Sequence, residues 1–392
     1  MKNDVYILSA KRTPIGSFGA SLSGLTAAEL GSHATAAALR AAGIAPEAVE
    51  EIFFGNVCSA GVGQAPARQI ALKTGLPLTS PATTINKVCA SGMKSVILAA
   101  QSIQLGDRNL MIAGGAESMS NIPYYATGSR WGMKYGDGAF VDGLAKDGLT
   151  DATENCAMGV LAERVCTENG ISREAQDAFA IKSYERSKTA WENGWFTEEV
   201  SPITLSSKKG EITIDTDEEF EKVDFAKLKS LRPAFDPTGT ITAANASTLN
   251  DGAAALVLCS ESALGQYNQN PIARILGYAE TATDPAHFTL APIEATKILL
   301  SKTGVAIETI DLFEINEAFA MVPLAFGSAL GVSIDQINVH GGAVSLGHPI
   351  GCSGARIITT LVHALRTHKK KLGLAAICNG GGGASAILIE VL

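Results

Sequence analysis

Cys89 lies within NKVCASGMKS, where an apolar stretch gives way to a helical pattern that includes Met93 and Val96. A thiol at the start of a helix faces the positive end of the helix dipole and free backbone N–H groups, which together favour a nucleophilic thiolate. Most free cysteines are instead small buried hydrophobes. This stretch alone therefore leaves two interpretations open, a reactive thiol and a structural cysteine.

Three further residues of catalytic type stand where other strands are expected to end. Asn316 follows the apolar run LFEI, Cys378 lies in AICNGGGG, and His348 lies in the glycine-rich turn SLGHPIG. Ligands bind beyond the carboxyl ends of the strands in open α/β sheets, so these three residues and Cys89 are expected to converge. The N–H groups of the glycines after Cys378 are free to bind an oxyanion.

Metal and phosphate sites explain these residues less well. The separations between Cys89, His348 and Cys378 are not those of zinc ligands. A phosphate-binding loop would need GxGxxG after the first strand or a GKS/T motif, and the chain has neither.

The composition describes an acidic protein with ample material for large cores. Of its 392 residues 46% are hydrophobic and 18% charged, with a formal net charge of −8, which argues against disordered and nucleic-acid-binding proteins. The seven cysteines are scattered without CxxC pairs, as is typical of a reducing compartment. No signal-peptide pattern and no apolar stretch of membrane-spanning length is visible. We therefore expect a cytoplasmic protein that binds neither nucleic acid nor membrane.

An internal repeat organises the chain. VEEIFFGNV (49–57) resembles IDLFEINEA (310–318), and the segment 89–118 resembles 351–385: each has a Ser-Gly step, an apolar-faced helix, an apolar strand and a glycine-rich exit. Strand–helix–strand units of this kind predict two similar α/β halves with parallel strands. We assign 1–118 with 249–270 to the first half and 271–392 to the second.

The intervening segment 119–248 differs in character. It contains the glycine- and aromatic-rich stretch NIPYYATGSRWGMKYGDG, a helical pattern near REAQDAFAIKSYERSKTAWENG and a charged run over 206–230. We interpret it as a loop domain folded over one half, because long inserted loops usually cover a site. The charged run itself is more typical of solvated surface.

Four motifs in this order resemble the thiolase family over the whole chain: NKVCASGMKS, NEAFA (316–320), GGAVSLGHPIGCSGAR and CNGGGGASA. The resemblance implies the thiolase fold, an α/β fold with two pseudo-repeated βαβαβαββ halves, a five-layered αβαβα core and an inserted loop domain. It is strongest to the short-chain members, and so implies an acyltransferase that reversibly condenses two acetyl-CoA molecules to acetoacetyl-CoA and CoA. The reaction would be ping-pong, through an acetyl group on Cys89.

The resemblance also assigns roles to the chemical groups. Cys89 would be the nucleophile, deprotonated by His348, and Cys378 the base that removes a proton from the second acetyl-CoA. One oxyanion site would comprise His348 and a water held by Asn316, and the other the backbone N–H groups of Cys89 and Gly380. No cofactor is required for this chemistry.

Positions for coenzyme A and a cation follow from the same resemblance. Residues matching the CoA site are Met158, Tyr184, Lys222, Val223, Asp224, Lys227, Phe235, Ala243, Ser247, Ala318 and Phe319. A potassium site beside the CoA loop would use Tyr184, Ala243, Ala244, Ala246 and Val344. The family also implies a homodimer or homotetramer, with the loop 120–140 as a tetramer contact.

Two departures from the family pattern bear on binding rather than chemistry. Ala157 stands where many short-chain relatives have histidine, and Lys222 where arginine is common, so the acyl range and the CoA affinity are affected. Two alternative functions remain: a 3-ketoacyl-CoA thiolase for longer chains, and a non-catalytic CoA- or lipid-binding scaffold.

Overall fold

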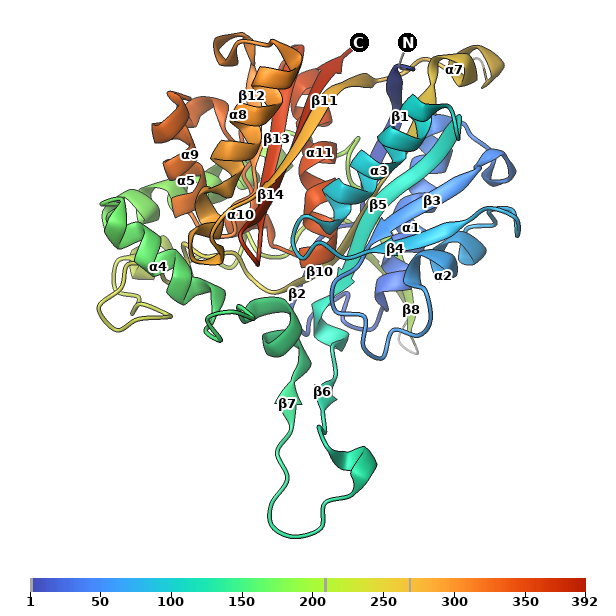
Figure 1. Ribbon diagram of the computed structural model, residues 1–392. Helices are drawn as coiled ribbons and strands as arrows, with labels where there is room; N and C mark the ends of the chain where they lie inside the picture. The colour runs from blue at the N-terminus through green and yellow to red at the C-terminus, as the bar shows by residue number, and fades with distance from the viewer. Residues whose placement is uncertain (1–2, 208–209, 268) are drawn as a thin grey trace.

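The computed structural model describes residues 3–207, 210–267 and 269–392, and it contains two α/β halves with the same strand order (Figure 1). In the first half the sheet runs β4-β3-β5-β10-β1, and the short strand β2 pairs with β10. Strand β3 is parallel to β4 and β5, while β10 is antiparallel to β5 and β1. Its elements are β1 (Val5–Arg12), β2 (Gly16–Ser17), α1 (Ala27–Ala42), β3 (Glu51–Gly55), α2 (Pro66–Lys73), β4 (Ala82–Ile85), α3 (Ser91–Leu105), β5 (Leu110–Ser118) and β10 (Asn250–Ser260).

The second half repeats this order as β12-β13-β14-β11, after the linking helix α7 (Glu261–Tyr267). Its third strand, which the βαβαβαββ pattern predicts, is reduced to a single parallel bridge between Phe313 and Ile337. The elements are β11 (Ala273–Ala282), α8 (Ala291–Thr303), β12 (Leu312–Ile315), α9 (Met321–Leu330), α10 (Ala343–Leu346), α11 (Ile350–Thr367), β13 (Leu372–Asn379) and β14 (Gly383–Val391).

The two sheets are continuous, because β1 also pairs antiparallel with β11, Val5 lying opposite Ile275. Helices α1 and α2 cover the outer face of the first sheet, and α8 and α9 pack with the strands of the second half. Helices α3 and α11 form the layer between the sheets (Figure 1). The predicted α/β fold with five αβαβα layers is confirmed.

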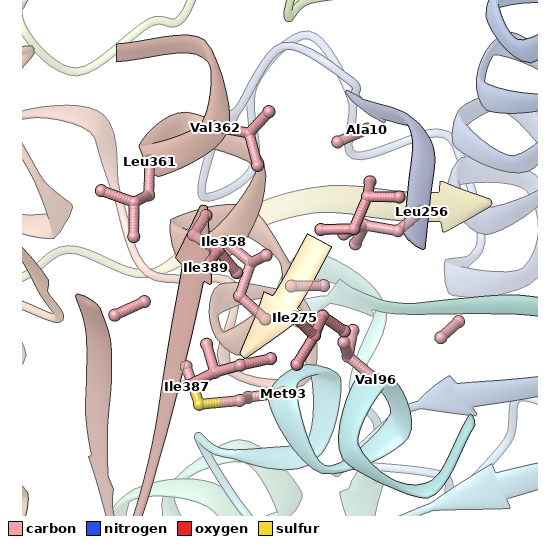
Figure 2. Close-up of a cluster of buried hydrophobic side chains, with 14 of the residues drawn as sticks. Ala10, Met93, Val96, Leu256, Ile275, Ile358, Leu361, Val362, Ile387 and Ile389 are labelled. Carbon is pink, nitrogen blue, oxygen red and sulfur yellow. The ribbon is translucent and has the colours of Figure 1, made fainter. Parts of the chain in front are cut away.

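Side chains from both halves form the central core. Met93 and Val96 of α3 meet Ile358 of α11 and strand residues from both sheets, among them Leu256 and Ile387 (Figure 2). Burial of such apolar surface contributes about 25 cal/mol per Å² removed from water, so this layer supplies much of the stability.

Helices α3 and α11 approach one another closely at two glycines. A Cβ atom on Gly92 would lie 2.7 Å from the Ala355 backbone nitrogen, and one on Gly354 would lie 2.3 Å from that of Met93. Glycine is therefore required on both helices. The Ser-Gly step of the sequence repeat marks this crossing, near the N-terminus of α3, which follows Cys89, and of α11, which follows His348.

The segment between the halves folds over them, and one part projects. Strands β6 (Tyr124–Tyr125) and β7 (Val141–Asp142) begin a hairpin that extends away from the body (Figure 1). The helix expected near REAQDAFAIKSYERSKTAWENG is present as α5. The remaining elements are α4 (Met158–Glu168), α5 (Arg173–Glu192), β8 (Ile203–Ser207), β9 (Gly210–Ile214) and α6 (Phe225–Leu228).

A buried ion-pair cluster joins this segment to β1. Arg12 is fully buried, donates to both carboxylate oxygens of Asp217 (2.6 and 2.9 Å) and also pairs with Glu199. The charged run 206–230 is thus not entirely solvated surface, since Asp217 and Phe220 are buried; residues 208–209 of the run lie outside the described residues. Among the described helices, none is long and apolar enough to cross a membrane.

Candidate active site

Cys89 lies in the tight turn between β4 and α3, as predicted. The preceding Val88 has φ = +47°, a conformation that costs a β-branched residue about 1–3 kcal/mol. Hydrogen bonds hold the turn: the Lys87 N–H donates to Ser91 Oγ (2.8 Å), and the Ser91 hydroxyl donates to the Val88 carbonyl (2.6 Å). Strain is therefore maintained immediately before the candidate nucleophile.

The environment of the Cys89 thiol corrects one expectation. Burial raises its pKa to about 11, although the backbone N–H groups of Gly380 and of Cys89 itself hydrogen-bond the sulfur and oppose the rise. The sequence argument, based on the helix dipole, predicts the opposite direction. Desolvation prevails because the charged form loses more hydration than these donors replace. Such a thiol needs a base to accept its proton during attack.

Cys378 and Gly380 approach Cys89 from the second half. Cys378 is the penultimate residue of β13 and is buried. Burial raises its pKa, and the interaction with the neighbouring Cys89 raises it further. The two sulfur atoms and the Gly380 N–H thus meet at the carboxyl ends of β4 and β13, where the sequence predicts convergence.

His348 lies in the turn between α10 and α11, and the turn is fixed to β10. Its N–H donates to Asn250 Oδ1 (2.9 Å). The preceding Gly347 has φ = +109°, and a Cβ there would lie 2.4 Å from Asn250 Cγ, so no other residue fits. Asn250 therefore determines where the His348 backbone lies.

The imidazole of His348 is held in one tautomer. Its Nδ1 lies 2.5 Å from Ser353 Oγ, and the Ser353 hydroxyl donates to the Pro349 carbonyl (3.0 Å). Since the hydroxyl hydrogen is used, Ser353 accepts from Nδ1–H, and Nε2 carries the lone pair. Burial, together with the positive charge of Arg356, lowers the pKa of His348 to about 3. The ring is thus a neutral base at physiological pH.

Asn316 faces the free side of this ring. Its Nδ2 lies 3.5 Å from His348 Nε2, and it follows the end of β12 as predicted. Its Oδ1 is buried and has no hydrogen-bond partner among the described residues. A buried amide oxygen without a donor is costly, so this position suits a bound water or substrate group.

One group of predicted CoA residues forms an apolar wall. Met158 is the first residue of α4, and the Phe235 ring packs so closely on Gly159 that a Cβ there would lie 2.3 Å away. The rings of Phe235 and Phe319 meet edge to face, with centroids 5.9 Å apart. Met158 also approaches Gly380, whose Cβ position lies 3.6 Å from Met158 Cε. This wall therefore leads to Cys89.

Ser247 and Ala318 lie at the same wall. The Ser247 hydroxyl donates to the Ala318 carbonyl (2.9 Å), as does its backbone N–H (3.1 Å). Ser247 is a predicted CoA contact, and because its hydroxyl hydrogen and its N–H are both used, only its oxygen lone pairs are free for a ligand.

A second group of predicted residues lines a cavity of about 380 Å³. Lys222 pairs with Glu219 (3.7 Å) and Lys227 with Asp224 (2.9 Å), so each lysine has an acidic neighbour along the chain. Predicted residues lining this cavity are Tyr184, Lys222, Val223, Asp224, Lys227, Ala243 and Ala244.

The two remaining predicted cation residues, Ala246 and Val344, are not among the residues that line this cavity. Ala246 forms a bridge with Phe319, and Val344 packs with Tyr184 in a small core cluster. Within the described chain, no hydrogen bond reaches the carbonyl oxygens of Ala243 and Ala244. Unpaired carbonyl oxygens fit a monovalent cation.

A further cavity of about 600 Å³ lies beside Cys89. Val88 and Gly380, which flank the thiol, line it together with Val57 and Met158. A larger cavity, of about 790 Å³, lies between the α4–α5 turn, α8 and α9 and contains none of the predicted residues.

Sequence reasoning missed three residues around this site: Asn250, Ser353 and Glu117. Ser353 had a signal, because it occupies the Ser-Gly step of the repeat. Glu117 is buried and accepts four hydrogen bonds, yet in the sequence it stands only at a glycine-rich strand exit. No described group of three or more His, Cys, Asp or Glu side chains is arranged to hold a metal ion.

Comparison with known proteins identifies the family. Residues 5–262 match the thiolase N-terminal domain, and residues 269–391 match the thiolase C-terminal domain. The chain is 52% identical over 390 residues to the cytosolic acetyl-CoA acetyltransferase ERG10 of Gibberella zeae, covering 99% of this chain and 98% of that one. It is also 52% identical over 392 residues to mitochondrial acetyl-CoA acetyltransferase A of Xenopus laevis, covering 100% and 92%.

Solved structures agree with the sequence relatives. The Acat5 thiolase of Ascaris suum in complex with coenzyme A has a TM-score of 0.95 at 48% identity, covering 99% of this chain and 100% of that one. The Bacillus anthracis acetyl-CoA acetyltransferase has a TM-score of 0.97 at 38% identity, covering 100% and 99%. With both domains matched and the fold and site in agreement, the chain belongs to the thiolase family.

Proposed function

We propose that the protein is an acetyl-CoA C-acetyltransferase, which reversibly condenses two acetyl-CoA molecules to acetoacetyl-CoA and CoA. One observation carries the proposal: the Cys89 sulfur, beside Cys378, accepts the Gly380 N–H. Relatives about 50% identical over the full chain carry this name, and one similar thiolase was solved with coenzyme A.

The first half-reaction acetylates Cys89. As the sulfur attacks the thioester carbonyl, His348 Nε2 accepts the thiol proton and the N–H groups of Cys89 and Gly380 stabilise the oxyanion. The bond to the CoA sulfur then breaks, and the leaving CoA takes the proton of the Cys378 thiol, so that Cys378 becomes a thiolate while His348 keeps the proton it accepted. Exchange of one thioester for another has a free-energy change near zero, so the acetyl-enzyme is neither too stable to react further nor too unstable to form.

The second half-reaction forms the carbon–carbon bond. The Cys378 thiolate removes an α-proton from the second acetyl-CoA, and the raised pKa of Cys378 makes that thiolate a stronger base. The protonated His348, whose Nε2–H now donates, and a water on Asn316 stabilise the enolate oxygen. The enolate carbon attacks the acetyl carbonyl, the bond to Cys89 breaks, and acetoacetyl-CoA is released. His348 returns its proton to the Cys89 sulfur, and the α-proton stays on Cys378.

Coenzyme A would lie between the loop segment 119–248 and the two halves. Its pantetheine arm would follow the wall of Met158, Phe235 and Phe319, with Ser247 and Ala318 beside it. Its nucleotide would lie at the 380 Å³ cavity with Lys222, Val223, Asp224 and Lys227. The lysines then exchange their acidic neighbours for phosphate oxygens.

A wider acyl range is the second candidate function. The 600 Å³ cavity beside Cys89 far exceeds an acetyl group; Val57, Val88 and Met158 give it some apolar surface, while Lys146, Asp147 and Asp151 also line it. Its volume is the observation that favours activity on 3-ketoacyl-CoA substrates longer than C4. Relative kcat/KM values for C4 and C8 3-ketoacyl-CoA distinguish the two functions.

Three properties complete the proposal. Potassium would bind the carbonyls of Ala243, Ala244 and Ala246 near Tyr184 and Val344, and equal turnover in sodium and potassium buffers would exclude it. The protein would act in the cytoplasm, although similar relatives include both cytosolic and mitochondrial proteins.

It would also assemble as a homodimer or homotetramer. The projecting hairpin carries large exposed apolar side chains, including Trp131 and Tyr135, which suit a contact between copies. Trp131→Ser should reduce the mass measured by light scattering if the hairpin joins copies.

The deciding experiment is the intact mass of the protein after mixing with acetyl-CoA. The wild type should gain one acetyl group, and Cys89→Ala should gain none. A wild type that gains nothing when fresh and reduced would favour the non-catalytic CoA- or lipid-binding scaffold.

A further inference from the structure

The internal repeat places a second, non-catalytic copy of the site in the molecule. In the first half, Gly55, the last residue of β3, pairs with Gly115, three residues before the end of β5. Asn56 follows Gly55 directly, and Glu117 stands two residues beyond Gly115.

The second half has the same register with catalytic residues in these places. Ile315 of β12 pairs with Ala376 of β13. Asn316 follows Ile315 directly, and Cys378 stands two residues beyond Ala376. Asn56 is thus equivalent to Asn316, and Glu117 to the candidate base Cys378.

The helix starts complete the equivalence. Cys89 stands two residues before the Ser91-Gly92 step, and Gly351 two residues before the equivalent step in α11. The two steps meet at the crossing of α3 and α11, where Gly92 and Gly354 make their close backbone contacts. Gly351 is therefore the counterpart of the nucleophile, and its N–H the counterpart of the Cys89 N–H.

Glu117 fills this second site with a negative charge. Its Oε2 accepts the N–H groups of Gly351 (2.9 Å) and Val57 (3.0 Å). Its Oε1 accepts the Cys58 N–H (3.1 Å) and Asn56 Nδ2 (3.0 Å). Two backbone donors on one oxygen make the geometry of an oxyanion hole, occupied here by a carboxylate of the protein itself.

The backbone held by Glu117 leads directly to the candidate base. Gly351 lies three residues after His348, at the start of the helix whose Ser353 orients the imidazole. Cβ atoms at Gly55 and Gly115 would lie 2.8 and 2.1 Å from the Gly351 carbonyl oxygen, so the backbone of Gly351 is enclosed on several sides. The N–H of this residue finds its partner in Glu117.

We propose that Glu117 is a positioning residue for the thiolase reaction, whose carboxylate holds the start of α11 and so places His348 relative to Cys89. The proposal rests on the proposed function. Burial raises the pKa of Glu117 to about 7, opposed by the N–H donors of Val57, Cys58 and Gly351. Assays at pH 8 therefore examine the charged form.

Glu117→Ala tests the proposal, with thiolysis of acetoacetyl-CoA as the assay. We expect kcat to fall about 10- to 100-fold, the usual effect of a displaced catalytic group, while KM stays within about twofold. Formate, a carboxylate that fits the vacated donors, should restore part of kcat in this variant and leave the wild type unchanged. If Glu117→Ala does not fold, Glu117→Gln is the substitute test. It keeps the side-chain volume but lacks the charge, and it should also lower kcat.

Asp311→Asn is the matched control. Asp311 also clamps two backbone N–H groups, those of Lys371 (3.1 Å) and Leu372 (2.9 Å), at the end of β13 remote from Cys378. This variant should lose thermal stability and keep its kcat.

The outcomes separate this proposal from the proposed function. If the wild type forms no acetyl-enzyme, the proposed function fails. If the wild type is acetylated and folded Glu117 variants are acetylated and turn over at the wild-type rate, only the positioning role fails. The positioning role would also be overturned by a second result for Glu117→Ala. In that result formate does not restore kcat, and KM rises by the same factor by which kcat falls.

Discussion

His348 Nδ1 lies 2.5 Å from Ser353 Oγ, and this contact decides which nitrogen of the imidazole is the base. The Ser353 hydroxyl is committed to the Pro349 carbonyl, so only its lone pairs face the ring. The neutral ring therefore presents Nε2 to Asn316 and to the site. Ser353 thus plays the part that a carboxylate plays in other base-orienting pairs.

Ser353→Ala should accordingly lower kcat about tenfold or more, because an imidazole without its Nδ1 partner loses both tautomer and orientation. Acetylation of Cys89, followed by rapid-quench mass measurement, should slow by the same factor. Ser353→Thr keeps the hydroxyl and should retain more activity. Equal rates in the wild type and the alanine variant would show that the contact has no catalytic effect.

The repeat in the sequence was enough to predict most of this architecture. The segments 49–57 and 310–318 predict paired strands, and the strand ends predict the convergence of Cys89 with Cys378. The fold follows because apolar strands, Ser-Gly steps and glycine exits are local patterns that each half repeats.

Other features depend on tertiary contacts that no local pattern encodes. Whether Cys89 is a thiol or thiolate depends on desolvation by distant segments, which outweighs the helix dipole at its own turn. Glu117 has no signal in its neighbourhood, because its donors come from the turn after β3 and from α11. The third strand of the second half forms only the Phe313–Ile337 bridge although its sequence has a counterpart in the first half.

The pKa of Cys89 predicts how an alkylating reagent will behave. Since the pKa is raised to about 11, the thiol form prevails below that pH. The thiolate fraction, and with it the rate of alkylation by iodoacetamide, should rise about tenfold per pH unit between pH 7 and 10. Intact mass measures the rate, with Cys89→Ala for background labelling. A rate that levels off near pH 8 would contradict the raised pKa.

Acetylation by acetyl-CoA should respond differently to pH. His348, whose pKa is about 3, is already neutral above pH 5 and accepts the proton during attack. The acetylation rate should therefore lack a titration step near the usual histidine pKa of about 6.5. His348→Asn should abolish rapid acetylation and leave alkylation nearly unchanged. Equal loss of both reactions would point to a disturbed Cys89 turn instead.

Glu280 links the two halves close to the nucleophile and provides a prediction on stability. It pairs with Lys87 (2.7 Å) and Lys94 (2.6 Å). Burial opposes its charge, but the two lysines prevail and lower its pKa. A lowered pKa contributes stability above the unfolded-state pKa, and that stability is lost as the pH falls through the folded-state value. Glu280→Gln should thus cost about 1 kcal/mol at pH 7 and progressively less below pH 4.

Thermal melting of wild type and variant across this pH range measures the effect. Glu294→Gln is the control, because Glu294 pairs with Lys297 at 2.8 Å on the exposed face of α8, where ion pairs contribute little. A loss that is equal at pH 7 and pH 3.5 would mean that packing, and not charge, explains the Glu280 variant.

The close crossing of α3 and α11 predicts that adding one methyl group at Gly354 strongly destabilises the protein. A Cβ at Gly354 would lie 2.3 Å from the Met93 backbone nitrogen, and backbone cannot move aside as a side chain can. Gly354→Ala should therefore destabilise the protein by about 3 kcal/mol, in spite of the better helix propensity of alanine. Gly265→Ala, in α7 with open space around its Cβ position, should instead stabilise by about 1 kcal/mol. The added methyl group should also push α3 and α11 apart. Since Cys89 precedes α3 and His348 precedes α11, Gly354→Ala should increase the distance between these two residues and lower kcat. Melting temperatures and kcat for the two variants test both effects; if the two alanines change stability alike, the helices tolerate a wider separation than their contacts indicate.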